Sequence, residues 1–391
     1  MPTKVLIAGA GVAGLEAALA LRELAGDLLE VELVAPETEF VYRPLAVTEP
    51  FRAGEATRFP LHRLAEAAGA GITRASVRSV DSQRRVLITS DGGALHYDAL
   101  LLSLGARAVP GIPGALTFRG PADEEAFSAL LQDARAGRVT KLVFALPSGT
   151  SWPLPVYELA LLTAVHLADA GASRVELTLV TPEERPLQLF GTAGSEAAAE
   201  LLAQHGINLL VDTTPVAVED GSLRMLPDQW IDADHVVALP RLEGLRLEGV
   251  PHDAKGFVPT DTSGVVRGLE DVFAAGDLTD FPIKQGGIAA QQADAAAESI
   301  AAAAGARLDP QPFRPVLRGL LLTGLTPRYL RSEPASEHSA ADTEPLWWPP
   351  AKIVGRYLAP FLASQLHITE GPPPASGDRV AVDVDLAAHV P

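Results

Sequence analysis

The chain has 391 residues, enough for two or three domains of roughly 100–200 residues each, and its 47% hydrophobic and 20% charged residues exclude wholesale disorder. It carries 31 Lys and Arg against 49 Asp and Glu, a formal net charge of −18, so contact with nucleic acid or anionic lipid would need a local basic patch. It has no cysteine, which excludes a disulfide, a thiolate nucleophile, a Cys-ligated metal and a redox dithiol.

The N-terminal residues predict a βαβ unit. Residues 5–8 are a short apolar run typical of a buried parallel strand, residues 15–24 are rich in Ala and Leu and predict a helix, and residues 31–34 predict the next strand. The turn between the first strand and the helix contains three glycines in a dinucleotide-binding spacing, namely Gly9, Gly11 and Gly14. This spacing permits a tight turn and lets a pyrophosphate approach the backbone at the helix N-terminus.

The residues that follow the second strand are less decisive. An acidic ligand for the adenosine ribose is expected at the end of that strand, where Ala35 stands, so Glu37 is the nearest candidate. Residues 77–89 alternate in hydrophobicity and precede the turn at residues 91–93, which predicts a β-hairpin or a small meander.

The same plan recurs in the middle of the chain. Residues 141–146 and 177–180 predict strands, and residues 157–168 predict the helix between them. The sequence Leu-Val-Ala-Pro-Glu at 33–37 matches Leu-Val-Thr-Pro-Glu at 179–183, and a further strand match keeps the same order. We interpret these matches as an internal duplication of a doubly wound domain, with chance similarity of apolar strands as the alternative.

A second motif lies late in the chain. Residues 268–277 predict a turn and a buried strand that ends in Gly276 and Asp277. A carboxylate there can accept a hydrogen bond from a ribityl hydroxyl of FAD, and Gly276 allows a close approach. Lys284 then precedes a predicted helix at residues 288–303, which would place positive potential where flavin reduction adds negative charge.

These motifs, together with a Tyr97-Asp98 strand followed by Gly105, resemble the FAD-dependent pyridine nucleotide–disulfide oxidoreductase superfamily over residues 4 to about 300. Residues 40–44 and 284–287 are similar to the type II NADH dehydrogenase and sulfide:quinone reductase-like members. The resemblance implies FAD contacts in both segments and at the first meander strand, from Arg43, Val77, Gly105, Gln285 and Gly286. It also implies a quinone-like acceptor, whereas the lack of cysteine excludes the thiol chemistry of disulfide and sulfide:quinone reductases.

The second dinucleotide site departs from the pattern. Residues 146–153 read Leu-Pro-Ser-Gly-Thr-Ser-Trp-Pro, so Gly149 is the one glycine present, and the prolines offer no N–H to a phosphate. Trp152 is expected to pack at the domain interface rather than to stack on a ligand ring. After the matching strand, Glu183 and Glu184 would favour NADH whereas Arg185 would favour NADPH, so nicotinamide binding stays open.

Two residues are candidates for catalysis. The resemblance implies that Glu158 handles protons at a quinone site, and its apolar neighbours predict a raised pKa suited to a general acid. The alternative is a glutamate that complements the helix dipole. Lys284 is expected beside the flavin, with a solvated surface lysine as the alternative. The nine histidines stand singly, so no metal site is predicted.

The C-terminal part predicts a cover for the flavin. Residues 313–331 are expected to form a strand pair and residues 333–344 a mobile loop. Residues 352–366 show apolar helical spacing, which favours a helix that packs on the protein or on a second subunit of a homodimer over peripheral membrane contact. The tail at residues 371–391 is expected to be partly extended. No apolar run reaches the roughly 18–20 residues of a membrane span, and no signal peptide is expected, so the predicted compartment is cytoplasmic.

The predicted fold is α/β, with two doubly wound, Rossmann-like, three-layer nucleotide-binding domains. The first would be discontinuous, at residues 1–108 and 246–308, with the second domain at 109–245 and a C-terminal segment at 309–391. The predicted function is an FAD-dependent oxidoreductase that passes two electrons, as hydride from NAD(P)H, to a small quinone-like acceptor, without a nucleic-acid partner. The alternatives are a flavoenzyme with a non-nicotinamide donor and a non-catalytic flavin-holding interaction protein.

Overall fold

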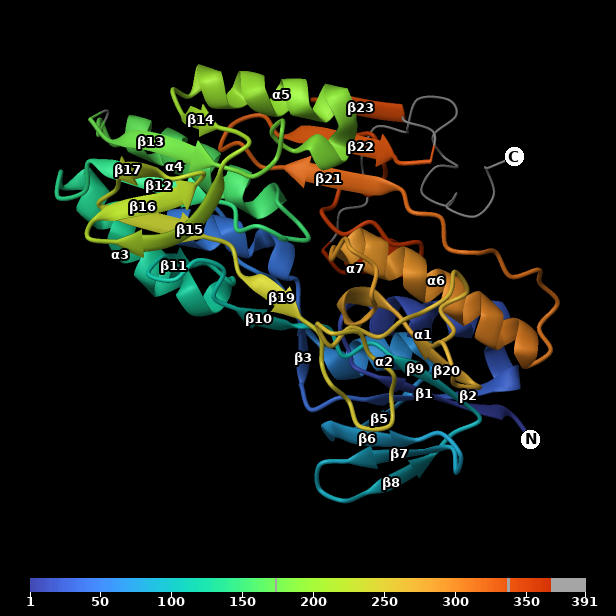
Figure 1. Ribbon diagram of the computed structural model, residues 1–391. Helices are drawn as coiled ribbons and strands as arrows, with labels where there is room; N and C mark the ends of the chain where they lie inside the picture. Colours follow the sequence, from blue (N-terminus) through green and yellow to red (C-terminus); the bar gives the residue numbers. More distant parts are fainter. Residues whose placement is uncertain (173, 336–337, 367–391) are drawn as a thin grey trace.

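The computed structural model describes residues 1–172, 174–335 and 338–366. Figure 1 shows two lobes, each built on a five-stranded parallel sheet, with a three-stranded antiparallel sheet from the C-terminal part beside them. The predicted tail at residues 371–391 lies outside the described residues.

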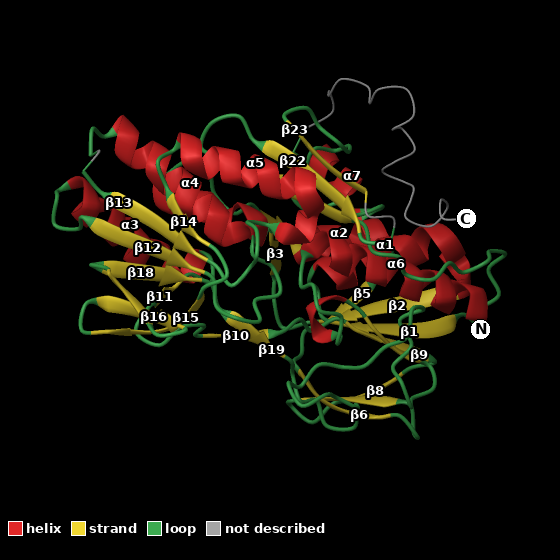
Figure 2. Cartoon of the chain, turned by 45° about the horizontal axis from the view of Figure 1, so that its top comes forward, coloured by secondary structure: helices red, strands yellow, loops and turns green. Residues whose placement is uncertain are grey.

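The first lobe joins the beginning of the chain to residues beyond 270. Its parallel sheet has the order β20 (Val272–Ala274), β9 (Ala99–Leu102), β1 (Thr3–Ala8), β2 (Leu29–Val34), β5 (Gly71–Thr73). Helices cover one face (Figure 2), namely α1 (Val12–Ala25), α2 (Leu61–Ala68) and α6 (Gly286–Ala303), and the other face carries the meander β6 (Val77–Asp81), β7 (Val86–Thr89) and β8 (Ala94–His96). Along β1, Val5 and Ile7 pack among the helices while Leu6 and Ala8 pack toward the meander, which is the alternation expected of a strand buried on both faces.

The second lobe repeats this plan. Its parallel sheet has the order β11 (Leu116–Thr117), β18 (His235–Ala238), β12 (Lys141–Ala145), β13 (Glu176–Val180), β14 (Asn208–Leu210). The covering helices are α3 (Glu124–Arg135), α4 (Leu154–Asp169) and α5 (Gly191–Gln204), and the meander is β15 (Thr214–Glu219), β16 (Ser222–Leu226) and β17 (Gln229–Asp232). Four strands share their order between the lobes, in agreement with the predicted duplication, whereas the edge strand comes late in the first lobe (β20) and early in the second (β11); the α/β fold class is confirmed. The exact domain limits stay a prediction.

Two short antiparallel strand pairs stand outside the main sheets, one between the lobes and one within the first lobe. The chain leaves the first lobe through β10 (Arg107–Val109) and returns through β19 (Arg241–Glu243), and these two strands pair antiparallel. The small ladder β3 (Glu39–Val41) and β4 (Arg58–Pro60) flanks the segment that follows β2.

The C-terminal part corrects two expectations. The antiparallel sheet comprises β21 (Leu317–Leu321), β22 (Arg328–Glu333) and β23 (His338–Asp342), so a strand occupies much of the loop expected at residues 333–344. Helix α7 (Leu358–Gln365) begins six residues after the expected start at 352, and its Leu358 and Leu362 are buried in the helical core of the first lobe. Within the described ranges, no helix combines the length and the apolarity needed to cross a bilayer.

Candidate active site

The glycine turn lies between β1 and α1. A Cβ added to Gly9 would lie 2.4 Å from the backbone oxygen of Ser103, and one added to Gly14 would lie 2.1 Å from the Gly9 carbonyl oxygen, so both positions require glycine for packing. Gly11 differs, because a Cβ there would meet no described atom within 4 Å. Gly11 is also the N-cap of α1, and no side chain in the described part of the chain caps this helix. An open, uncapped helix N-terminus fits the pyrophosphate of FAD.

Several predicted cofactor residues follow strands of the first sheet. Glu37 is exposed three residues after β2 ends, and Gly105, with φ +73°, lies just beyond β9. Because the carboxyl ends of parallel strands share one edge of a sheet, these residues lie on the same edge as the glycine turn. Val77 is set apart, since it begins the first meander strand and is half-buried there.

The Gly-Asp motif closes this edge after β20. Gly276 has φ +79°, a conformation that favours glycine, and its N–H donates to Gln292 Oε1 at 2.8 Å. The half-buried Asp277 follows. Burial raises the pKa of the Asp277 carboxyl, and the positive charges of Lys284 and Arg43 oppose that shift. The Asp277 carboxyl group can accept a hydrogen bond from a hydroxyl group of a ligand.

Lys284 is not a solvated surface lysine. Its side chain is 7% exposed, its Nζ donates to the Thr279 carbonyl oxygen, and it lies 4.0 Å from the centroid of the Phe257 ring. Burial lowers the pKa of Lys284 to about 8, against the opposing influence of nearby carboxylates, Asp277 foremost.

The next two residues start α6. Gln285 is the N-cap, where its Oε1 accepts from Ile288 N at 2.8 Å and its Nε2 donates to the Arg318 carbonyl oxygen at 3.2 Å. A Cβ on Gly286 would lie 2.9 Å from the side chain of Ile353, so the C-terminal segment packs directly on this helix start.

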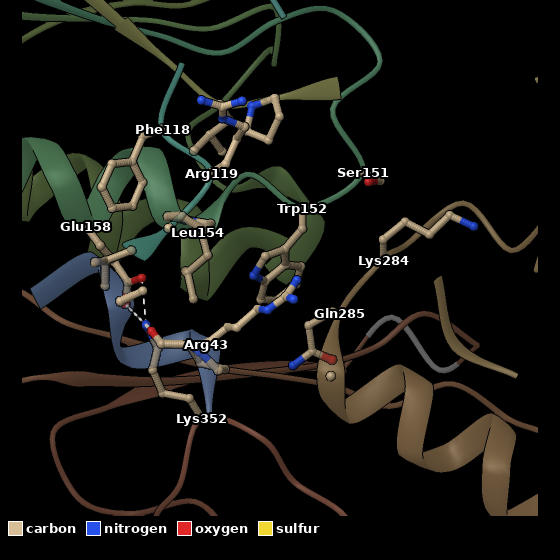
Figure 3. A pocket seen from close by; sticks show the side chains of 18 of the residues that line it. Arg43, Phe118, Arg119, Ser151, Trp152, Leu154, Glu158, Lys284, Gln285 and Lys352 are labelled. Carbon is tan, nitrogen blue, oxygen red and sulfur yellow. Dashed lines mark hydrogen bonds and ion pairs between the residues drawn. The ribbon is translucent and has the colours of Figure 1, made fainter. Parts of the chain in front are cut away.

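A cavity of about 290 Å³ lies between the two lobes (Figure 3). Its lining brings together predicted residues of the first lobe with residues of the second lobe and the C-terminal part, including Arg43, Asp277, Lys284, Gln285, Gly286, Arg119, Trp152, Glu158 and Lys352. The two candidate catalytic residues, Glu158 and Lys284, therefore line one space, although they are 126 positions apart in the chain.

Glu158, on α4, forms a buried ion pair that the sequence did not predict. Its carboxylate oxygens accept from Lys352 Nζ at 2.6 and 2.7 Å (Figure 3). Oε1 also accepts from Leu322 N at 2.9 Å. Lys352 Nζ donates further to the Pro44 carbonyl oxygen at 3.1 Å. Burial raises the pKa of Glu158, as predicted, and Lys352 offsets part of the rise. The sequence signal for Lys352 is weak, namely a lone cation beside the apolar residues 353 and 354.

Near the end of β13 in the second lobe, side chains of the chain bond to one another. Tyr157 Oη donates to Glu183 Oε2 at 2.6 Å and Thr181 Oγ1 donates to the same oxygen at 2.9 Å, so Glu183 is turned inward and buried. Burial raises the pKa of Glu183, and the two hydroxyl donors oppose the shift. Trp152 packs edge-on against Phe190 of the same lobe, with 5.6 Å between ring centroids, and it also lines the cavity, so its expected place at the domain interface stays a prediction.

The neighbouring candidates Glu184 and Arg185 are exposed. As for metals, in the portion of the chain covered by the structure, no group of three or more His, Asp or Glu side chains is arranged to hold an ion.

Comparisons with known proteins match this architecture. The chain is 27% identical over 297 residues to apoptosis-inducing factor 3 of Mus musculus, with 72% of this chain and 46% of the relative covered, so it spans about half the length of that relative. It is 26% identical over 293 residues to an NADH dehydrogenase-like protein of Mycobacterium tuberculosis, with 71% and 72% covered. The solved structure of sulfide:quinone oxidoreductase from Aquifex aeolicus has a TM-score of 0.79 at 20% identity, with 87% and 86% covered, which shows a shared fold.

The family comparison confirms the predicted resemblance. Residues 3–145 and 158–299 match the pyridine nucleotide-disulphide oxidoreductase family, whose members bind FAD and use NAD(P)H. The predictions of an oxidoreductase and of FAD as cofactor are thereby confirmed at the level of the family. The matched residues cover both lobes, and the chain belongs to the pyridine nucleotide-disulphide oxidoreductase family.

Proposed function

We propose that the chain binds FAD in its first lobe and passes two electrons from a small donor to a small quinone-like acceptor. The observation that carries this proposal is the cavity between the lobes, where Asp277 and Lys284 line one part and the pair Glu158 and Lys352 lines another. When bound, FAD supplies two-electron transfer chemistry. The residues of the chain position the reactants and handle charge and protons around it.

The proposed cofactor contacts follow the edge of the first sheet. The open, uncapped N-terminus of α1 at Gly11 would hold the pyrophosphate, and Asp277 would accept from a ribityl hydroxyl. Lys284 and the N-terminus of α6 would stabilise negative charge at the flavin end. The further predicted contacts are Gly9, Gly14, Glu37, Arg43, Val77, Gly105, Gly276, Gln285 and Gly286.

Glu158 and Lys352 would serve the acceptor. Reduction of a quinone to a quinol consumes two electrons and two protons, so a site that performs it needs a proton source and a cation near the oxygens that become anionic. Glu158 has a raised pKa and lies in the cavity wall, and Lys352 donates to both of its oxygens. This buried pair can hold a proton at Glu158 Oε and can exchange it with the acceptor.

Two classes of donor fit the proposed function. NAD(P)H, which the family uses, is the donor expected from the sequence. A small donor without nicotinamide is favoured by the inward-facing Glu183 and the proline-rich loop before α4.

The test is anaerobic mixing of the FAD-loaded protein with NADH or NADPH, followed by a water-soluble benzoquinone, while the flavin absorbance is recorded. Bleaching by a donor and recovery of absorbance with the quinone support an oxidoreductase. As a further step, the bound flavin is reduced with dithionite and mixed anaerobically with the quinone. If the protein takes up FAD but the quinone does not reoxidise this reduced flavin, the chain is instead a flavin-holding interaction protein.

A further inference from the structure

We infer that the second lobe does not bind a dinucleotide, because side chains of the chain itself fill the place where one would lie. The electron donor would then enter the cavity between the lobes as a small organic hydride donor without a nucleotide part. This inference rests on the proposed function and specifies its donor. It is carried by three features of the second lobe, which can be compared with the equivalent features of the first.

The start of α4 offers few N–H donors to a phosphate. In the first lobe β1 ends at Ala8 and α1 begins at Val12, whereas in the second lobe β12 ends at Ala145 and α4 begins at Leu154, so three connecting residues are replaced by eight. The N-cap of α4 is Pro153 and its second residue is Pro155, and neither has an N–H. The N–H of Val156 already donates to the Pro153 carbonyl oxygen at 3.1 Å. Three of the four positions from 153 to 156 therefore have no free N–H for a pyrophosphate.

Of the candidate ribose ligands, Glu183 is bound by other side chains, whereas Glu184 and Arg185 are exposed beside it. A dinucleotide would run from the start of α4 to the end of β13. Tyr157, in the first turn of α4, spans that path, with its Oη 2.6 Å from Glu183 Oε2 and accepting from Leu187 N at 3.3 Å. Tyr157 is fully buried and Glu183 is 8% exposed, whereas Glu37 at the matching strand end of the first lobe is exposed. A ribose could reach the Glu183 carboxylate only by breaking these buried hydrogen bonds.

The loop after β13 is fixed over this edge by packing. Phe190 contacts the Trp152 ring at 5.6 Å between centroids, and a Cβ on Gly319 of β21 would lie 2.4 Å from the Phe190 ring. The Phe190 side chain thus packs between the loop before α4 and the C-terminal sheet. The loop after β13, which carries Phe190, therefore cannot move away without displacing these two neighbours.

The space that remains suits a small donor. The cavity of about 290 Å³ is lined by Asp277 and Lys284 and would also have to receive the flavin end of FAD, so what it leaves suits a compact donor and not a dinucleotide. Thr150 and Ser151 line the cavity on the side of the second lobe, as does Arg119, which is paired with Asp123. The donor gives up a hydride, which is two electrons and one proton. The quinone-like acceptor takes up the two electrons with that proton and one more, which comes from solvent through Glu158, so the exchange is balanced.

The experiment uses FAD-loaded protein, so that the nucleotide site of the first lobe is filled. ADP-ribose, the nucleotide part of NADH without nicotinamide, is titrated by calorimetry. Separately, NADH and 1-benzyl-1,4-dihydronicotinamide, which carries the same hydride-donating ring without a nucleotide, are mixed anaerobically with the protein. We expect no saturable heat from ADP-ribose up to millimolar concentration. We also expect bleaching rates that rise linearly with the concentration of either dihydronicotinamide, with NADH less than tenfold faster.

Saturable ADP-ribose binding, or NADH bleaching that saturates and exceeds the benzyl compound by tenfold or more, would overturn the inference while leaving the proposed function intact. Failure of the protein to take up FAD, or of the quinone to reoxidise its dithionite-reduced flavin, would instead count against the proposed function. The uptake of FAD by the empty protein, measured in the same calorimeter, is the positive control for detecting nucleotide binding.

Discussion

Lys352 Nζ lies 2.6 and 2.7 Å from the two carboxylate oxygens of Glu158, although 194 positions separate the two residues in the chain. Glu158 is the fifth residue of α4, and Glu16 is the fifth residue of α1, the equivalent helix of the first lobe. Glu16 is buried as well, and its oxygens accept from Tyr357 N and Leu358 N at 2.8 Å each. The equivalent glutamates of the two lobes therefore bind the same C-terminal segment, which fixes that segment across the cavity.

The ion pair predicts a large effect of Lys352→Met on stability. The substitution leaves the Glu158 carboxyl buried without its cation, since the two side chains are 7% and 0% exposed. We expect the free energy of unfolding to fall by about 3–5 kcal/mol, as measured by urea denaturation at pH 7. The double variant Glu158→Gln/Lys352→Met should recover much of this loss, because no uncompensated charge remains. Equal stabilities of the single variant and the unmodified protein would show that the Glu158 carboxyl needs no cation, so that it is neutral when Lys352 is absent.

The proposed proton role predicts that Glu158→Gln slows reoxidation of the flavin by a benzoquinone. A glutamine keeps the shape of the side chain but cannot exchange a proton, so we expect a decrease of about 10²–10⁴-fold in the stopped-flow rate, with FAD content unchanged. Glu125→Gln, at an exposed position of α3, is the matched control and should leave the rate as it is. A Glu158→Gln rate within threefold of that control would exclude Glu158 from proton transfer.

Lys284 predicts a rise in stability with pH. Burial lowers its pKa from 10.5 to about 8, so above pH 8 the folded protein has released a proton that the unfolded chain still holds. The free energy of unfolding should therefore rise between about pH 8 and 10.5, by an amount on the order of 3 kcal/mol. Urea denaturation of the unmodified protein and of Lys284→Met across this range measures the difference, which should shrink for the variant. Parallel pH profiles would mean that Lys284 titrates normally.

Substitutions of two glycines in the first turn are expected to affect different properties, stability in one case and FAD affinity in the other. A Cβ on Gly14 would lie 2.1 Å from the Gly9 carbonyl oxygen, so Gly14→Ala should destabilise the protein by about 1–3 kcal/mol or more. A Cβ on Gly11 meets no described atom within 4 Å, so Gly11→Ala should fold normally and yet bind FAD at least tenfold more weakly. Thermal melts and FAD titrations of both variants check this. Unchanged FAD affinity in Gly11→Ala would place the pyrophosphate elsewhere.

The local elements could be predicted because each is encoded by a short pattern. Residues 5–8 and 141–146 are apolar runs, and β1 and β12 form there. The helix expected at 352–366 was wrong over its first six residues because periodic apolar residues report burial and not helix. Ile353 and Val354 are indeed buried, but in a non-helical segment. The strand β23 was missed because its polar residues gain their pairing from β22 and their packing from α5.

In the candidate site, too, residues in local motifs could be predicted, whereas contacts between distant residues could not. Gly9, Gly11, Gly14, Gly276 and Asp277 follow strands in recognisable spacing, so their shared edge could be predicted. Lys352 could not, because its partner Glu158 lies on a distant helix and ion pairs over such separations leave no local pattern. Glu183 was assigned to a ribose by its position, and the hydroxyl of Tyr157, which turns it inward, becomes apparent only in three dimensions.

Titration of the purified, cofactor-free protein with FAD tests the central claim most directly. We predict saturable binding of FAD in a one-to-one ratio, seen as quenching of flavin fluorescence, and binding at least tenfold weaker in Gly11→Ala while the thermal melt stays unchanged. A correctly folded protein that leaves the flavin fluorescence unquenched at every concentration would contradict the account.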